Sequence, residues 1–130
     1  CSPETSKPHY YNLEMNCCGN VYMAYGPDRH KREFVPVEVL EKITSSSSVV
    51  GPTKKFDPND KKWEIEIKVP WLVYQSLSQI TTPTKGTVWK GNFYKCGDKL
   101  PKIHYGSWAK IDVPNPDFHR PEFFGELIFE

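Results

Sequence analysis

The feature that most constrains the fold of this chain is a run of strict alternation ended by a proline. Between Lys62 and Val69, apolar and charged side chains alternate without a break, and Pro70 follows. A period of two places the apolar side chains on one face of a β-strand. Proline has no amide hydrogen to give to a sheet, so the strand ends before it. The run predicts a strand whose inward side chains are Trp63, Ile65, Ile67 and Val69.

Other segments carry related signals. Tyr10 to Cys17 alternates as well, with Tyr11, Leu13, Met15 and Cys17 on its apolar face, which predicts a half-buried strand. Gly19-Asn20 then predicts the turn of a hairpin with a second strand. The further strands expected are at residues 21–25, 88–96, 125–129 and, more briefly, 104–108.

Short helices and loops fill the remaining sequence. Pro36 opens a segment to Ile43 with helical spacing, for which a strand is the competing interpretation. Trp71 to Leu77 predicts one or two helical turns. The serine-rich stretch Thr44 to Ser48 predicts a mobile linker.

The chain has 130 residues, which suits one domain, and its 12 prolines and 14% aromatic residues favour a loop-rich β protein over a helical bundle. We therefore expect an all-β, antiparallel β-sandwich over residues 1–130. The first predicted strand begins as early as Tyr10 and would leave one edge of the sheet unpaired. We therefore also expect strands to be missing on its N-terminal side, or to be supplied by a second copy in a dimer. On this view the chain is the C-terminal portion of a longer domain.

Charge and hydropathy exclude some classes of function. A net charge of +1 gives no field for nucleic acid, and no apolar run has the length of a membrane-spanning helix. The four cysteines fit no zinc-site spacing. Cys17 and Cys18 would point to opposite faces of a strand. A Cys17–Cys96 disulfide and a small buried thiol are both open interpretations. Cys1 fits either a lipid-accepting cysteine or a cut end of the chain, and the cut is favoured.

Residues 89–130 concentrate side chains suited to a sugar-binding surface. Aromatic rings stack on the C–H faces of sugars, and polar side chains bind the hydroxyl groups. The candidates of these types are Tyr105, Trp108, Phe118, His119 and Arg120. For Trp108, a role as a plug at the end of the sandwich is an equally good interpretation. For Phe123 and Phe124 the plug is favoured.

A second candidate surface is polar. Asn12, Glu14 and Asn16 share the other face of the first strand, and Lys90 and Asn92 would adjoin them if the two strands paired. Amides are unfavourable in strands, so their presence invites a functional reason, and Glu14 and Asn92 are kept as candidate sugar contacts. A solvated sheet face is the favoured alternative.

Other chemistry finds less support in the sequence. The basic run around Arg29 and His30 suits acidic sugars, although a solvated charge run is more common. No cofactor is expected; a calcium loop at Asp57, Asn59 and Asp60 competes with a plain turn, which is favoured because the EF-hand spacing is absent.

Two sets of side chains have the types that catalysis needs. Cys96 with His104 or His119 would make a nucleophile and base, and Glu14 with Glu64 a carboxylate pair. No pattern in the sequence fixes either geometry. The chain is therefore not expected to be an enzyme.

Six motifs together resemble a known family. They are YYNLEMNCCG at 10–19, AYGPDRHKRE at 24–33, WEIEIKVPW at 63–71, NFYKCGD at 92–98, SW at 107–108 and PDFHRPEFFGEL at 116–127. In this order they resemble the family 9 carbohydrate-binding-like proteins, which belong to the DOMON-like β-sandwiches, in the version typical of gut Bacteroidetes. The last motif is the most specific.

The resemblance implies non-catalytic glycan binding between aromatic side chains, with a poly- or oligosaccharide as the partner. It implies an exported glycan-handling system, and so a secreted, periplasmic or cell-surface location. Phe118 takes the place at which better-known members carry a tryptophan. A structural or protein-interaction domain is the alternative, and a haem-binding redox domain using Met15 or Met23 is a third.

Overall fold

The computed structural model describes residues 1–51, 57–59 and 61–130, and β-strands dominate them. These residues form nine strands, two short α-helices and one 3-10 turn. Every strand pair with a defined register is antiparallel. The all-β, antiparallel class predicted from the sequence is confirmed.

The chain divides into two compact units, neither of which is a continuous segment. Unit 1 comprises Cys1–Tyr11, Gly26–Arg32 and Thr82–Glu130. Unit 2 comprises Asn12–Tyr25 and Glu33–Thr81.

A three-stranded sheet begins the fold, in the order β1-β2-β3. Its strands are β1 (Tyr10–Met15), β2 (Val21–Gly26) and β3 (Glu33–Phe34), so the predicted hairpin strands are present. The expected alternation of burial along β1 is wrong. Tyr10 and Tyr11 are both buried, whereas Met15 is 40% exposed, because the strand starts inside the protein and becomes steadily more exposed towards its end.

Two glycines serve the turns of this region. Gly19 has φ +86°, which closes the turn after β1 at little steric cost. A Cβ on Gly26 would collide with the Lys31 carbonyl oxygen and lie 2.7 Å from Arg32 Cα. The loop that joins β2 to β3 therefore passes so close to β2 that only glycine fits there.

The serine-rich segment of unit 2 is a strand, so the mobile linker expected there is wrong. Strand β4 (Thr44–Ser47) pairs in antiparallel register with β5 (Ile65–Lys68). Backbone pairing makes no demand on side-chain type, and Ser45 and Ser47 donate hydrogen bonds from their hydroxyls to backbone carbonyls of Gly19 and Cys17. Tertiary contacts thus override the weak strand propensity of serine.

The alternating run is a shorter and less buried strand than its pattern predicts. Ile65 and Ile67 are half-buried, their neighbours Glu66 and Lys68 are exposed, and Trp63 lies before β5 with 38% of its surface exposed. The predicted helical turns are present as α1 (Val37–Leu40) and α2 (Trp71–Gln75). Each follows a proline, which has φ near the helical value and needs no hydrogen-bond partner there.

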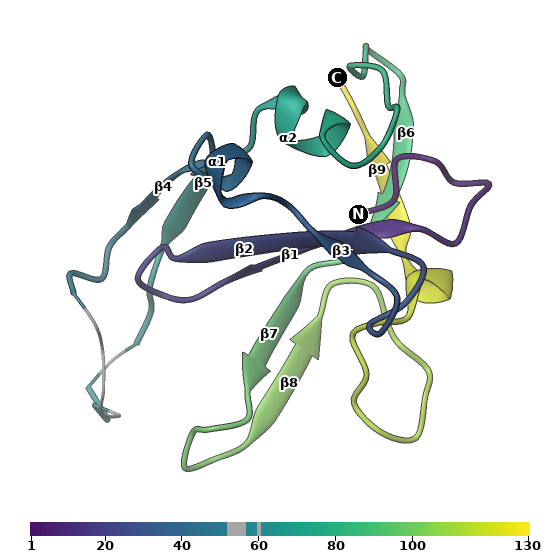
Figure 1. Ribbon diagram of the computed structural model, residues 1–130. Helices are drawn as coiled ribbons and strands as arrows, with labels where there is room; N and C mark the ends of the chain where they lie inside the picture. Colours follow the sequence, from purple (N-terminus) through teal and green to yellow (C-terminus); the bar gives the residue numbers. More distant parts are fainter. Residues whose placement is uncertain (52–56, 60) are drawn as a thin grey trace. The chain divides into compact units, whose positions relative to one another are not determined.

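Unit 1 contains two separate two-stranded sheets (Figure 1). Strand β6 (Val88–Gly91) pairs with β9 (Gly125–Ile128), and Ser2 bridges to Lys90 on β6. Strand β7 (Tyr94–Gly97) pairs with β8 (His104–Ser107) as a hairpin. The single strand expected over residues 88–96 is therefore wrong, since the chain changes partner at Asn92 and Phe93.

Each unit has its own buried side chains. In unit 1, Trp89 packs edge-on against Phe129 with ring centroids 5.1 Å apart. In unit 2, Met23 and Val73 have no exposed surface, and burial of each contributes about 1.5–3 kcal/mol. The buried apolar residues are Tyr10, Tyr11 and Trp89 in unit 1, and Met23, Ala24, Val35, Ile43 and Val73 in unit 2.

Candidate functional site

An aromatic cluster covers one face of the β7–β8 hairpin. The register pairs Tyr94 with Ser107 and Cys96 with Tyr105, which places the two tyrosines on the same face. Phe118 stacks on Tyr94 at 4.4 Å with 8° between the rings, and it meets Tyr105 edge-on at 6.0 Å. Phe118 is half-buried, while 45% of the Tyr105 surface is exposed.

An open groove of about 260 Å³ runs beside this cluster. Its lining combines apolar surface with a few polar groups, as in many small-molecule sites. Tyr105 and Phe118 contribute aromatic surface, while Ser107, Asn115 and Asp117 contribute hydroxyl, amide and carboxylate groups. The other lining residues are Gly106, Ile111, Val113, Pro114 and Pro116.

Trp108 lies just beyond strand β8. With 57% of its surface exposed, it is the most exposed tryptophan among the described residues. Its ring meets Phe93 edge-on at 5.9 Å. The ring also lies close to Gly125, where an added Cβ would be 2.6 Å from it. Trp108 is therefore supported by a glycine and a phenylalanine, and it keeps more than half of its surface exposed.

Asn92, a predicted sugar contact, has its side chain in backbone hydrogen bonds. Its Oδ1 accepts from the amides of Phe93 (2.9 Å) and Ala109 (2.8 Å), and its Nδ2 donates to the Ala109 carbonyl (2.9 Å). The side chain thus replaces strand pairing where β6 gives way to β7. These contacts indicate a structural role.

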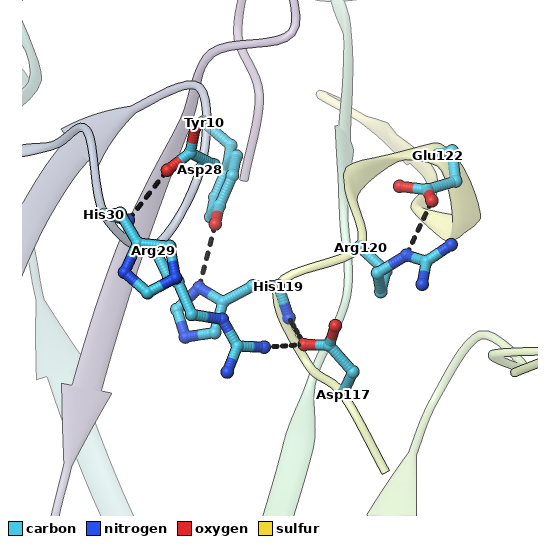
Figure 2. A network of polar contacts seen from close by, with 8 residues as sticks. All are labelled: Tyr10, Asp28, Arg29, His30, Asp117, His119, Arg120 and Glu122. Atoms are coloured by element: carbon cyan, nitrogen blue, oxygen red, sulfur yellow. Dashed lines mark hydrogen bonds and ion pairs between the residues drawn. The ribbon is translucent and has the colours of Figure 1, made fainter. Parts of the chain in front are cut away.

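A polar network adjoins the aromatic cluster (Figure 2). The Tyr10 hydroxyl lies 2.8 Å from His119 Nδ1. Arg29 forms an ion pair with Asp117, whose carboxylate also accepts the His119 amide at 3.0 Å. Strand β1 and the loop after β2 therefore hold the segment that carries Phe118.

Two further ion contacts organise the same region. Arg120 Nε donates to Glu122 at 2.6 Å, and its guanidinium lies 5.6 Å from the centroid of the Phe123 ring. The Asp28 carboxylate accepts the backbone amides of His30 and Lys31, which holds its pKa below the ordinary value. Within the basic loop, Arg29 pairs with Asp117 and the Nη1 of Arg32 is buried, so these two side chains do more than face solvent.

Burial changes the acidity of two tyrosines. The Tyr94 hydroxyl is buried without a hydrogen-bond partner among the described residues, and this burial raises the pKa of Tyr94 to about 12. The nearby Asn92 side chain opposes this only in part. Burial also raises the pKa of Tyr10, against the charges of Arg32 and Arg29. Both phenols stay neutral near pH 7, so they act through packing and hydrogen bonds.

Glu14 lies on β1 in unit 2, whereas Asn92 follows β6 in unit 1. The expected pairing was wrong because β1 pairs with β2, whereas β6 pairs with β9. The Glu14 carboxylate accepts the Asn12 side-chain amide at 2.8 Å. It also lines an open hollow of about 310 Å³, together with Met15, Asn16, Asn20, Val21 and Tyr22.

The cysteines are thiols, with no disulfide among the described residues. The Cys17–Cys96 disulfide is therefore wrong for this structure; as thiols, Cys17 is half-buried and Cys96 is exposed on β7. Cys17 and Cys18 lie in a turn instead of on a strand, so the expectation of opposite faces does not apply.

The part of the chain that the structure describes contains no cluster of metal-binding side chains. Among residues 1–51, 57–59 and 61–130, no group of three His, Cys, Asp or Glu side chains could hold a metal ion. Asp57 accepts the backbone and side-chain amides of Asn59, as in a plain turn, while Asp60 lies outside the described residues. Met23 is fully buried and Met15 partly exposed.

Several residues of this region were not singled out in the sequence. Tyr94, Asp117 and Tyr10 have no role predicted from the sequence beyond membership of a strand or a motif. Their roles depend on contacts between segments as far apart as residues 10 and 119, which no local pattern reports. The recurrence of aromatic and polar types in the quoted motifs was the one signal that pointed to them.

No helix among the described residues is long and apolar enough to cross a membrane. This agrees with the absence of a long apolar run in the sequence.

Comparisons with known proteins give a consistent result. The model of the family described as "Carbohydrate-binding family 9" matches residues 1–129. The chain is also similar to the crystal structure of a "putative carbohydrate-binding protein" from Bacteroides uniformis ATCC 8492, with 37% sequence identity and a TM-score of 0.85. That match covers 99% of this chain and 58% of the other. A search of curated proteins found no match.

Proposed function

This chain belongs to carbohydrate-binding family 9, and from that premise we propose that it is a non-catalytic glycan-binding module of an exported glycan-handling system. The family consists of non-catalytic binding modules that are typically extracellular. Because the chain spans 58% of the Bacteroides uniformis protein, the activity of any longer protein is part of the proposal. A secreted, periplasmic or cell-surface location follows from the same reasoning.

The observation that carries the proposal is an exposed aromatic side chain, Tyr105, in a groove with polar lining, with the exposed Trp108 three residues further along the chain. Tyr105 borders the groove, and Trp108 follows the strand that carries Tyr105. An exposed ring stacks on the apolar face of a sugar, whereas hydroxyl, amide and carboxylate groups of the groove bind its hydroxyls. We assign stacking to Tyr105 and Trp108.

The remaining candidates have supporting roles in this proposal. Phe118 has one ring face on Tyr94, so it backs the groove and offers less surface to a ligand. His119 and Arg120 have partners in Tyr10 and Glu122 and hold the loop in place. Asp117 and Asn115 are the groove residues that we expect to contact sugar hydroxyls.

The test is affinity electrophoresis of the intact chain through gels that contain one neutral or acidic polysaccharide each. We expect at least one glycan to retard the protein. Trp108→Ala and Tyr105→Ala should each abolish or strongly reduce that retardation. Trp63→Ala is the matched control, because Trp63 is an exposed tryptophan of unit 2 that the proposed site does not use.

The outcomes separate the alternatives. No retardation of the folded protein by any glycan of a broad panel would remove the proposal. Retardation that survives Trp108→Ala and Tyr105→Ala but is lost in Glu14→Ala would move the site to the unit 2 hollow.

A protein-interaction module is the second candidate, for a specific reason. Phe93 and Ile103 are 65% and 63% exposed, and with Trp108 they give residues 93–108 an unusual apolar surface. This surface suits a protein partner if the glycan panel fails.

A further inference from the structure

The turn between β1 and β2 places two thiols side by side. Cys17 Sγ and Cys18 Sγ lie 3.9 Å apart, and both side chains are half-buried, so each keeps access to solvent. Both are in thiol form. The proposed function uses neither of them, and no zinc-type partner stands with them among the described residues.

Hydrogen bonds fix the backbone of this turn. Asn16 Oδ1 accepts the amides of Cys18 and Asn20, each at 3.0 Å. From β4, the Ser47 hydroxyl donates to the Cys17 carbonyl and the Ser45 hydroxyl donates to the Gly19 carbonyl at 2.7 Å. The carbonyls on both sides of Cys18 are thus anchored, which keeps the neighbouring thiols close together.

We propose that Cys17 and Cys18 form a reversible dithiol–disulfide site whose reaction partner is a small disulfide such as oxidised glutathione. The thiolate of one cysteine attacks the small disulfide, forms a mixed disulfide and releases one reduced thiol. The second thiolate then attacks the protein sulfur of that mixed disulfide and releases the other. Two protein thiols are oxidised, one disulfide is reduced, and both thiol protons pass to the released thiols.

Chain geometry makes such a bond easy to reduce again. Neighbouring Cα atoms joined by a trans peptide are about 3.8 Å apart, shorter than the range of about 4.4–6.8 Å found for ordinary disulfides. The ring that closes is therefore strained, and strained disulfides are the labile ones. The sulfurs must also approach from 3.9 Å to about 2 Å, which needs side-chain rotation.

Oxidation would have a local structural consequence. In the reduced form, the Cys18 thiol donates to the Gly51 carbonyl at 2.9 Å. A disulfide sulfur carries no hydrogen, so this contact between the turn and residues after β4 is lost. Asn16 and Asn20, which brace the turn, also line the unit 2 hollow, so its shape is linked to the redox state.

The experiment treats the whole chain with defined ratios of oxidised to reduced glutathione, blocks remaining thiols by alkylation, and maps peptides by mass. We expect Cys17 and Cys18 to lose alkylation together, in one peptide lighter by two hydrogen atoms, and to recover it with dithiothreitol. The Cys96→Ser variant should behave identically. Cys17→Ser and Cys18→Ser should instead stop at a glutathione adduct on the remaining cysteine.

Several results would overturn the proposal. They are stable glutathione adducts on both cysteines of the unchanged protein, a bond from either cysteine to Cys1 or Cys96, or alkylation of the pair that no glutathione ratio diminishes.

A second probe tests the geometry without ring strain. Phenylarsine oxide joins two neighbouring thiols through arsenic and releases water. We expect one equivalent to bind the reduced chain and binding to be lost in Cys18→Ser, a variant that keeps a hydroxyl donor for Gly51. Binding that persists in this variant would place the dithiol elsewhere and refute the assignment. Neither experiment depends on glycan binding, so the two proposals fail separately.

Discussion

Two parts of the aromatic region differ in how their rings are held. Phe118 and His119 have close partners, the first a parallel stack with Tyr94 and the second a hydrogen bond with Tyr10. Trp108 and Tyr105 instead keep 57% and 45% of their surfaces exposed. The sequence placed all four on one candidate surface. Residues of one chemical type therefore divide into those that build the surface and those that a ligand can reach.

The strongest test of this division is the stability of Phe118→Ala. Because the half-buried ring contacts Tyr94 and Tyr105, its loss should lower the free energy of unfolding by about 2–4 kcal/mol, somewhat less than for a fully buried phenylalanine. Trp108→Ala should cost less than about 1 kcal/mol. Urea denaturation measures both. Equal losses of free energy in Phe118→Ala and Trp108→Ala would show that the two rings do not differ in their structural role.

A somewhat smaller loss is expected at Asn92. Asn92→Ala removes three hydrogen bonds at the junction of β6 and β7, and should lower the free energy of unfolding by about 1–3 kcal/mol. Asn92→Asp keeps the oxygen that accepts from Phe93 and Ala109, so its loss in the same denaturation experiment should be smaller. An aspartate variant as unstable as the alanine variant would show that the loss of the Nδ2 donor, with a carboxylate oxygen now facing the Ala109 carbonyl, outweighs the two accepted hydrogen bonds.

Gly125→Ala tests whether the exposed ring of Trp108 takes part in glycan binding. Its Cβ would lie 2.6 Å from the Trp108 ring, so the ring must shift, at a cost of about 1 kcal/mol or less since it can move into solvent. We expect altered tryptophan fluorescence and weaker glycan retention. Gly91→Ala is the control, because its Cβ would meet Leu127 at 2.7 Å and leave Trp108 alone. Unchanged retention in Gly125→Ala would argue against Trp108 as a stacking surface.

The smallest effect concerns the pH dependence of stability. The pKa of Tyr94 rises from 10 to about 12 on folding, so its neutral form is favoured in the folded state. This contribution is complete below pH 10 and is lost as pH rises from 10 towards 12, where the unfolded chain ionises first. The free energy of unfolding of Tyr94→Phe, measured by urea denaturation at each pH, should therefore decrease less between pH 10 and pH 12 than that of the unchanged protein. A parallel decline would show that the phenol does not contribute.

The sequence predicted the strands and short helices well where the pattern was local. The alternation at residues 65–68, the proline-led helices at residues 37–40 and 71–75, and the hairpin after Tyr10 are all present. Its errors arose where a distant partner decides the structure. Thr44–Ser47 is a strand because β5 pairs with it, and residues 88–97 form two strands because Asn92 bonds to Ala109.

The candidate site was predictable in its residue types and less so in its geometry. The family motifs located the region between residues 92 and 127. Which rings are exposed depends on contacts such as Tyr94 with Phe118, which lie 24 positions apart and have no local signal. Whether these residues bind sugar stays a prediction.

The junction at Asn92 has a practical consequence for protein engineering. Its side chain is hydrogen-bonded to the backbone of Ala109, so the two ends of the segment 93–108 are held together at one point. Strands β6 and β9 lie outside this segment and pair with each other. We expect that hairpins taken from related modules could be exchanged between positions 92 and 109 to alter ligand preference, provided that an aromatic residue at position 94 still stacks on Phe118.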